Sequence, residues 1–149
     1  MAGIKITSSA FKNNAYLPSK YTCDGADVNP PLTIENIPAG AKSLALIVDD
    51  PDAPRGTWVH WVAWNIDPGT REIKEQSIPT GAAQGMNDFG NRGYGGPCPP
   101  SGTHRYFFKL YALDTALTLG PDATRAALEA AMKGHILDKA ELIGLYERK

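Results

Sequence analysis

The sequence predicts a mainly β domain with one well-marked helix. Three segments have the hydrophobic patterns of strands, at residues 43–49, 58–66 and 104–111, whereas only residues 123–133 form a sustained run of helix-forming residues. The chain has 149 residues, of which 42% are hydrophobic and 21% charged. This length allows one substantial hydrophobic core, so we expect a single domain over residues 1–149.

The first two of the three main strand segments have the patterns of buried strands. Residues 43–49 are a short apolar run between Gly40 and Pro51, which indicates a buried strand. Residues 58–66 are apolar on both faces, which is typical of a central strand. The two-residue period of a strand predicts one face with Trp58, His60, Val62, Trp64 and Ile66, and an opposite face with Val59, Trp61, Ala63 and Asn65.

The third main strand is predicted to direct His104, Tyr106, Phe108 and Leu110 to one face. Weaker strand signals lie at residues 4–7, 32–37 and 142–146. The helix is expected to open at Pro121 or Asp122 and to end before Gly134. His135 follows directly, where a cation interacts favourably with the helix dipole, so we assign it a capping or surface role.

Composition argues against several classes of protein. The net charge is -1, from 15 basic and 16 acidic residues spread along the chain, which provides no basic surface for nucleic acid. No apolar run approaches the roughly 18 residues of a membrane span, and the first residues lack the pattern of a secretory signal. We therefore expect a cytoplasmic protein without a membrane span. Cys23 and Cys98 match neither a disulfide scaffold nor a zinc motif, which favours two buried, reduced thiols.

Two histidines stand in similar and unusual surroundings. Residues 49–54 (Asp-Asp-Pro-Asp-Ala-Pro) precede His60, and residues 95–100 (Gly-Gly-Pro-Cys-Pro-Pro) precede His104. Residues 79–103 show no hydrophobic period and contain seven of the 15 glycines and four of the 12 prolines. A connection of this length in a compact domain usually has a function. We expect the strand ends with Asp50, His60 and His104 to meet beneath this loop and form a small pocket.

Such a pocket has the groups needed to bind an anion. Backbone N–H groups around Gly95, Gly96 and Cys98 are expected to converge, because glycine permits close approach of the backbone. Imidazole N–H groups and the hydroxyl of Tyr106 would add donors. Asp50 or Asp52 is expected to accept a hydrogen bond from His60, which orients the ring and favours its protonated form. The bonds Ala53-Pro54 and Pro99-Pro100 are candidates for the cis form.

Other interpretations of these residues have less support. A single histidine on an apolar strand face is usually a hydrogen-bonded core residue, but the pairing of His60 with His104 favours a site. A metal triad has little support, because the two histidines are far apart in the sequence and form no compact ligand motif. Cys98 or Ser101 next to His104 would be a nucleophile, yet neither lies in a recognised nucleophile motif.

At these segments the chain resembles the phosphatidylethanolamine-binding protein family, also called Raf kinase inhibitor proteins, and in particular its short bacterial and archaeal branch. The similarity rests on residues 50–60 and 99–106, and further on residues 21–25, 29–32, 87–90 and 93–98. It implies a β-sandwich with a large central sheet, a smaller second sheet and one or two short helices. It also implies an anion pocket for phosphate or phosphoryl head groups, with Cys98 contributing its backbone N–H. The pocket residues implied are Asp50, Pro54, Trp58, His60, Gly96, Cys98, Pro100, His104 and Tyr106.

The function expected from this resemblance is that of a non-enzymatic binding and regulatory protein, Raf kinase inhibitor-like, without a cofactor. Its partners would be a phosphate-bearing small molecule or phosphorylated group, a kinase or protease, and a second copy in a homodimer. One alternative is a serine protease inhibitor that acts through the surface loop at residues 76–91. Another is a weak hydrolase that uses His60, His104 and Asp50 as acid and base on phosphoesters.

Overall fold

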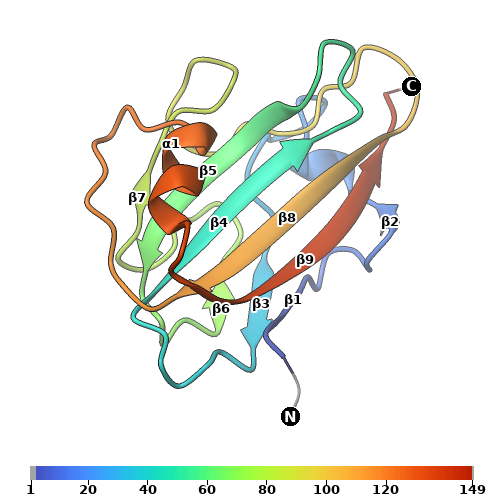
Figure 1. Cartoon of the computed structure of the whole chain (residues 1–149). Coiled ribbons are helices and arrows are strands. Elements are labelled where there is room, and N and C mark those ends of the chain that lie inside the picture. The colour runs from blue at the N-terminus through green and yellow to red at the C-terminus, as the bar shows by residue number, and fades with distance from the viewer. Residues whose placement is uncertain (1–2, 149) are drawn as a thin grey trace.

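The computed structural model describes residues 3–148 and arranges them as a β-sandwich with one α-helix (Figure 1). The large sheet has the strand order β2-β9-β8-β4-β5-β7 and the small sheet the order β1-β3-β6. The large sheet contains β2 (Ala15–Tyr16), β4 (Ser43–Asp50), β5 (Trp58–Ile66), β7 (Ala83–Gln84), β8 (His104–Leu113) and β9 (Ile136–Tyr146). The small sheet contains β1 (Lys5–Thr7), β3 (Leu32–Glu35) and β6 (Glu72–Ile73). The predicted fold class is confirmed.

Strand β4 lies at the centre of the large sheet because residues 44–48 form a continuous apolar run. All eight of its residues are buried, and it pairs antiparallel with β5 on one side and β8 on the other. Antiparallel pairing brings the end of β4, at Asp50, to the same edge of the sheet as the beginnings of β5 and β8. Trp58 and His104 begin those two strands. The predicted meeting of these strand ends is therefore present.

The large sheet separates two hydrophobic cores. One core lies between the two sheets and contains Trp61, Phe108 and Leu110. The other lies under α1 (Arg125–Met132) and contains Trp64 and Leu128. Figure 1 shows α1 across one face of β4 and β5, with the small sheet behind the opposite face. Burial of both faces explains the continuous apolar run at residues 44–48 of β4.

The predicted face assignment along β5 is correct for residues 61–64 and wrong toward both ends of the strand, because the strand contains two bulges. Its register against β4 shifts once between Val48 and Asp49 and once between Leu44 and Leu46. Each bulge adds one residue to β5 and reverses the order of its faces. Val59 consequently packs under α1 with Trp64, whereas Ile66 points into the inter-sheet core with Trp61. The first bulge places the His60 ring 5.2 Å from that of Tyr106, on the inter-sheet side.

Helix α1 begins later than predicted. Thr124 is its N-cap residue, and its hydroxyl accepts a hydrogen bond from the N–H of Ala127, so Pro121 and Asp122 precede the helix. Arg125 binds the buried carboxylate of Asp49 at 3.2 Å, which holds the helix against the sheet. His135 is exposed after the helix and lies 2.8 Å from Asp114.

The prediction for the two cysteines is wrong, and neither candidate peptide bond is cis. Cys23 and Cys98 form a disulfide, not two reduced thiols, with Cα atoms 5.4 Å apart. No cis peptide bond occurs within residues 3–148, so the bonds before Pro54 and Pro100 are trans. In the same part of the chain, no helix is long and apolar enough to cross a membrane.

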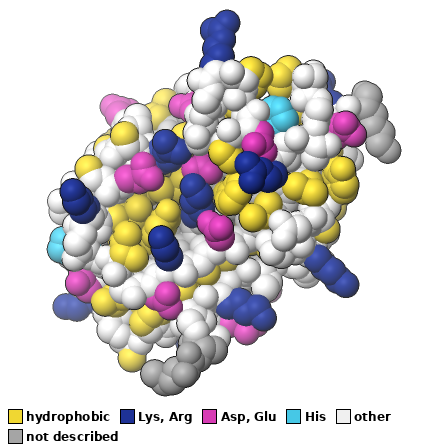
Figure 2. All heavy atoms as spheres, turned by 45° about the vertical axis from the view of Figure 1, so that its right-hand side comes forward, with side chains coloured by type: hydrophobic (Ala, Val, Ile, Leu, Met, Phe, Trp, Pro, Cys, Tyr) yellow, Lys and Arg dark blue, Asp and Glu magenta, His cyan; other side chains and the backbone are white. Residues whose placement is uncertain are grey.

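The surface over β8 and β9 has mixed charge. Figure 2 shows Lys and Arg side chains interleaved with Asp and Glu over this face, with apolar patches between them. Neither sign of charge dominates the visible face, which agrees with the net charge of -1.

Candidate functional site

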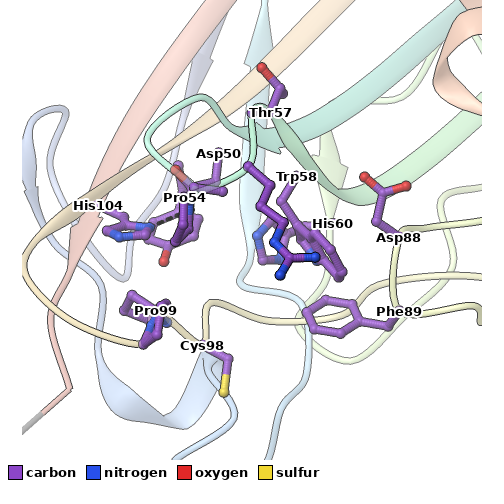
Figure 3. A pocket seen from close by; sticks show the side chains of 15 residues that line it. Asp50, Pro54, Thr57, Trp58, His60, Asp88, Phe89, Cys98, Pro99 and His104 are labelled. Carbon is purple, nitrogen blue, oxygen red and sulfur yellow. Dashed lines mark hydrogen bonds and ion pairs between the residues drawn. The ribbon is translucent and has the colours of Figure 1, made fainter.

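A cavity of about 510 Å³ lies at the edge of the large sheet where β4 ends and β5 and β8 begin. Figure 3 shows His104, Asp50 and Pro54 on one side, Asp88 and Phe89 on the other, and His60 and Trp58 between them. Its volume suits a small organic ligand. The lining residues are Asp50, Ala53, Pro54, Arg55, Gly56, Thr57, Trp58, His60, Asp88, Phe89, Cys98, Pro99, Pro100, His104 and Tyr106.

His104 is held by a buried carboxylate. Its Nδ1 atom lies 2.6 Å from Oδ2 of Asp50, and both side chains are buried. The other carboxylate oxygen, Oδ1, accepts the N–H of Asp52 at 2.8 Å. An ionised carboxylate only accepts, so Nδ1 of His104 is the donor. The remaining ring nitrogen, Nε2, makes no hydrogen bond within residues 3–148 and is available to a ligand.

His60 is held by a backbone carbonyl. Its Nδ1 donates to the carbonyl of Gly95 at 2.7 Å, so the neutral ring presents an unprotonated Nε2. The side chain is 2% exposed, and burial lowers the pKa of His60 below its usual 6.5. The predicted carboxylate partner of His60 is wrong. Asp50 binds His104, and Asp52 forms an ion pair with Arg105 that lowers the pKa of its carboxyl group.

Tyr106 contributes a buried hydroxyl without a partner. The residue is 1% exposed, and its oxygen makes no hydrogen bond within residues 3–148. Burial raises its pKa far above 10, so the phenol is protonated at neutral pH. Its ring lies 5.2 Å from that of His60 and 6.4 Å from that of His104. A buried polar atom without a partner is costly, so this hydroxyl marks a position where a ligand or water is expected to bind.

The glycine-rich loop does not form the predicted anion cradle. The N–H of Gly95 donates to the carbonyl of His60, and the N–H of Gly96 donates to Asp27 at 2.7 Å. Gly96 does not line the cavity; a Cβ there would lie 2.4 Å from the carbonyl oxygen of Tyr21. Of the three predicted N–H groups, only that of Cys98 makes no hydrogen bond within residues 3–148.

The mouth of the cavity combines the predicted Trp58 with residues that the sequence did not reveal. Phe89 and Trp58 are partly exposed and pack edge to face, with ring centroids 5.4 Å apart. Asp88 accepts the N–H of Val59 and donates its own N–H to the same residue's carbonyl, which folds the loop back onto the start of β5. Arg55 also lines the cavity, on the exposed turn after Pro54, and forms no ion pair within residues 3–148.

The structure thus brings eight of the nine predicted pocket residues around one cavity and leaves Gly96 outside it. Their role in binding a ligand stays a prediction. Among residues 3–148, no group of three or more His, Cys, Asp and Glu side chains is arranged to hold a metal ion. Cys98 is bonded to Cys23, so it has no free thiol to act as a nucleophile.

Residues 7–147 match the family described as phosphatidylethanolamine-binding protein. The chain belongs to this family. A UPF0098 protein from Pyrococcus abyssi is 57% identical over 150 residues, which cover 95% of this chain and 84% of the relative. Another, from Methanothermobacter thermautotrophicus, is 51% identical over 97% of this chain and 99% of its own length.

Two solved structures of the phosphatidylethanolamine-binding protein family have the same fold. The homologue CT736 from Chlamydia trachomatis is 42% identical and superposes with a TM-score of 0.96 over the whole of both chains. YbcL from E. coli, described as a new member of the mammalian family, is 34% identical, with a TM-score of 0.92 over 99% of this chain and all of its own. The family predicted from the sequence is therefore confirmed.

Proposed function

We propose that this phosphatidylethanolamine-binding protein family member is a non-enzymatic regulatory protein, Raf kinase inhibitor-like, whose cavity binds phosphate or a phosphoryl head group. The buried, unpartnered hydroxyl of Tyr106 is the observation that carries the proposal. It is a buried donor on a residue that lines the cavity. The Tyr106 ring lies 5.2 Å from that of His60 and 6.4 Å from that of His104, and the Nε2 atoms of both histidines make no hydrogen bond within residues 3–148.

These groups suit an anion that retains a proton. Tyr106 donates from its hydroxyl, and Arg55 adds positive charge at the mouth. Neutral His60 offers an acceptor at Nε2, which matches the remaining P–O–H group of a phosphate monoanion. A phosphoryl group loses its last proton near pH 6, so at physiological pH the monoanion is a minority form beside the dianion, and His60 would select it. The donors and the acceptor together favour a phosphoryl group over a carboxylate, which has no such proton.

The protein partners belong to the same proposal. A phosphorylated group presented by a kinase or its substrate would enter the cavity, and a homodimer is the oligomeric state that we propose. The serine protease inhibitor gains little support from the loop at residues 76–91. Ser77 and Gly85 are hydrogen-bonded to Asn29 and Val62, and the large exposed apolar side chains of the loop are Ile78 and Phe89, of which Phe89 lines the cavity. A hydrolase would need an activated water, because Cys98 is in a disulfide.

An NMR titration tests the proposal. Phosphate and then phosphoethanolamine are added to chelator-treated protein, and the ring signals of the three histidines are followed separately. The signals of His60 and His104 are expected to shift together and to saturate. The signal of His135, which is exposed beside Asp114, should stay in place. If neither pocket histidine responds to either ligand, the proposal fails.

Tyr106→Phe tests directly whether the buried hydroxyl of Tyr106 binds the ligand, because it removes the hydroxyl and keeps the ring. A hydrogen bond to a charged group contributes about 1.5–3 kcal/mol, so phosphate affinity should fall by roughly tenfold or more. Tyr111→Phe is the matched control, since Tyr111 is half-buried and packs against the core under α1. Calorimetric titration of both variants should show a loss only for Tyr106→Phe. Equal affinities would remove Tyr106 from the site.

A further inference from the structure

One wall of the cavity is held in place by the disulfide. Cys98, Pro99 and Pro100 line the cavity, and Cys98 is bonded to Cys23. Figure 3 shows the sulfur of Cys98 directed away from the cavity. The bond therefore anchors the wall from outside and leaves the ligand space open.

Hydrogen bonds hold the chain as far as Pro97 without help from the disulfide. The N–H of Gly95 donates to His60, and that of Gly96 to Asp27. The carbonyl of Pro97 accepts the N–H of Cys23 at 3.1 Å. These contacts do not involve either sulfur, so we expect them to persist when the disulfide is opened.

The chain after Cys98 has no such contacts. Residues 99–103 make no hydrogen bond to any part of residues 3–148. Pro99 and Pro100 have no N–H to donate, and Pro100 and the three residues after it are exposed. The next fixed point is His104, where β8 begins. The disulfide is thus the last anchor before a five-residue span of the cavity wall.

Both cysteines are partly exposed, so a thiol reductant can reach them. Reduction by a dithiol transfers two electrons and two protons to the protein. The S–S bond breaks, Cys23 and Cys98 become thiols, and the reductant leaves as its own disulfide. The free span of the wall then begins at Cys98 and includes every cavity-lining residue of this segment.

We propose that the Cys23–Cys98 pair is a reversible redox switch for the phosphoryl site: the disulfide holds the wall ready for the ligand, and reduction loosens the wall and weakens binding. This inference rests on the proposed function of the cavity. Binding to the reduced protein must order the wall, and this entropy cost reduces affinity. We expect phosphate to bind roughly three- to tenfold more weakly to the reduced protein.

Wall mobility is measured first, because it does not depend on a ligand. Backbone ¹⁵N order parameters are compared before and after treatment with dithiothreitol. Those of Cys98, Ser101, Gly102 and Thr103 should fall on reduction, while those of Tyr94, Gly95 and Gly96 and of strand β4 should not change. An unchanged wall, or loss of the dispersed spectrum of the whole protein, would overturn the proposal, since the bond would then be either redundant or required for the fold.

Phosphate affinity is measured next in the oxidised and reduced states. Cys23→Ser keeps the Cys98 side chain in the wall, so it should bind phosphate like the reduced protein and should not respond to dithiothreitol. Equal affinities of the oxidised and reduced proteins would overturn the switch and leave the phosphoryl site intact. If the oxidised protein binds no phosphate, the proposed function fails, while the mobility data still report whether the disulfide holds the wall.

Discussion

Oδ2 of Asp50 lies 2.6 Å from Nδ1 of His104, although the two residues are 54 positions apart in the chain. Asp50 ends β4 and His104 begins β8, so antiparallel pairing of the strands brings them together. The carboxylate accepts from one side of the ring and thereby leaves Nε2 for the cavity. The pairing of the strands thus fixes the orientation of the His104 ring in the site.

Asp50→Asn is expected to destabilise the protein. The amide keeps the shape of the side chain and loses the charge that strengthens the buried hydrogen bond to His104. We expect a loss of about 1.5–3 kcal/mol in the free energy of unfolding, measured by urea denaturation. Asp52→Asn is the control, because its ion pair with Arg105 is exposed and solvent-screened. A loss as large for Asp52→Asn as for Asp50→Asn would contradict this account.

His60 should make stability depend on pH. Burial lowers its pKa in the folded state, and this effect outweighs the hydrogen bond to Gly95 and the negative charges of Asp50, Asp49 and Asp88. Below about pH 6.5 the unfolded chain binds a proton that folded His60 does not bind, so stability falls as the pH falls. The loss continues down to the folded pKa. Urea unfolding at about pH 7.5 and about pH 5.5 should show a larger loss for wild type than for His60→Gln. Equal losses would show that His60 titrates normally.

Much of the fold could be predicted because the central strands have a strong sequence signal. Strands β4 and β5 are almost wholly buried, and β8 buries alternate residues. The predicted positions of all three are confirmed within a few residues. The first half of β9 escaped detection because it is largely exposed and polar, and only its buried end resembled a strand. The bulges of β5 depend on its register with β4, which no local pattern encodes.

The candidate site also combines residues that the sequence predicts with residues that only long-range contacts bring to the cavity. Asp50, His60 and His104 follow from strand ends that meet, which the sequence order already indicates. Phe89 and Asp88 reach the cavity because their turn folds back onto Val59, a contact across 29 residues. The separation of 75 residues between Cys23 and Cys98 likewise carries no information about pairing. Long-range contacts of this kind are visible only in the folded structure.

Gly96→Ala is expected to destabilise the fold without acting on the ligand directly. The added methyl group would lie 2.4 Å from the carbonyl oxygen of Tyr21 and 2.4 Å from Oδ1 of Asp27, so this segment must shift. Overpacking of this kind costs about 1–3 kcal/mol. Gly120→Ala is the control, because a Cβ at Gly120 would meet nothing within 4 Å. The stability of this variant should be unchanged or slightly higher than that of the wild type. Thermal unfolding of the two variants distinguishes them. Equal midpoints would mean that the loop absorbs the methyl group freely.

Arg55→Gln tests whether charge at the mouth contributes to phosphate binding. Arg55 lines the cavity and forms no ion pair within residues 3–148, so its charge is available to an anion. Its attraction is partly screened by solvent, and we expect phosphate affinity to fall by roughly two- to fivefold at low salt. Arg71→Gln is the control, since Arg71 is an exposed arginine outside the cavity lining. Calorimetric titrations at about 20 mM and about 300 mM salt should show that the difference between Arg55→Gln and wild type shrinks as salt rises. A difference that persists at high salt would mean that Arg55 acts by shaping the turn after Pro54, not through its charge.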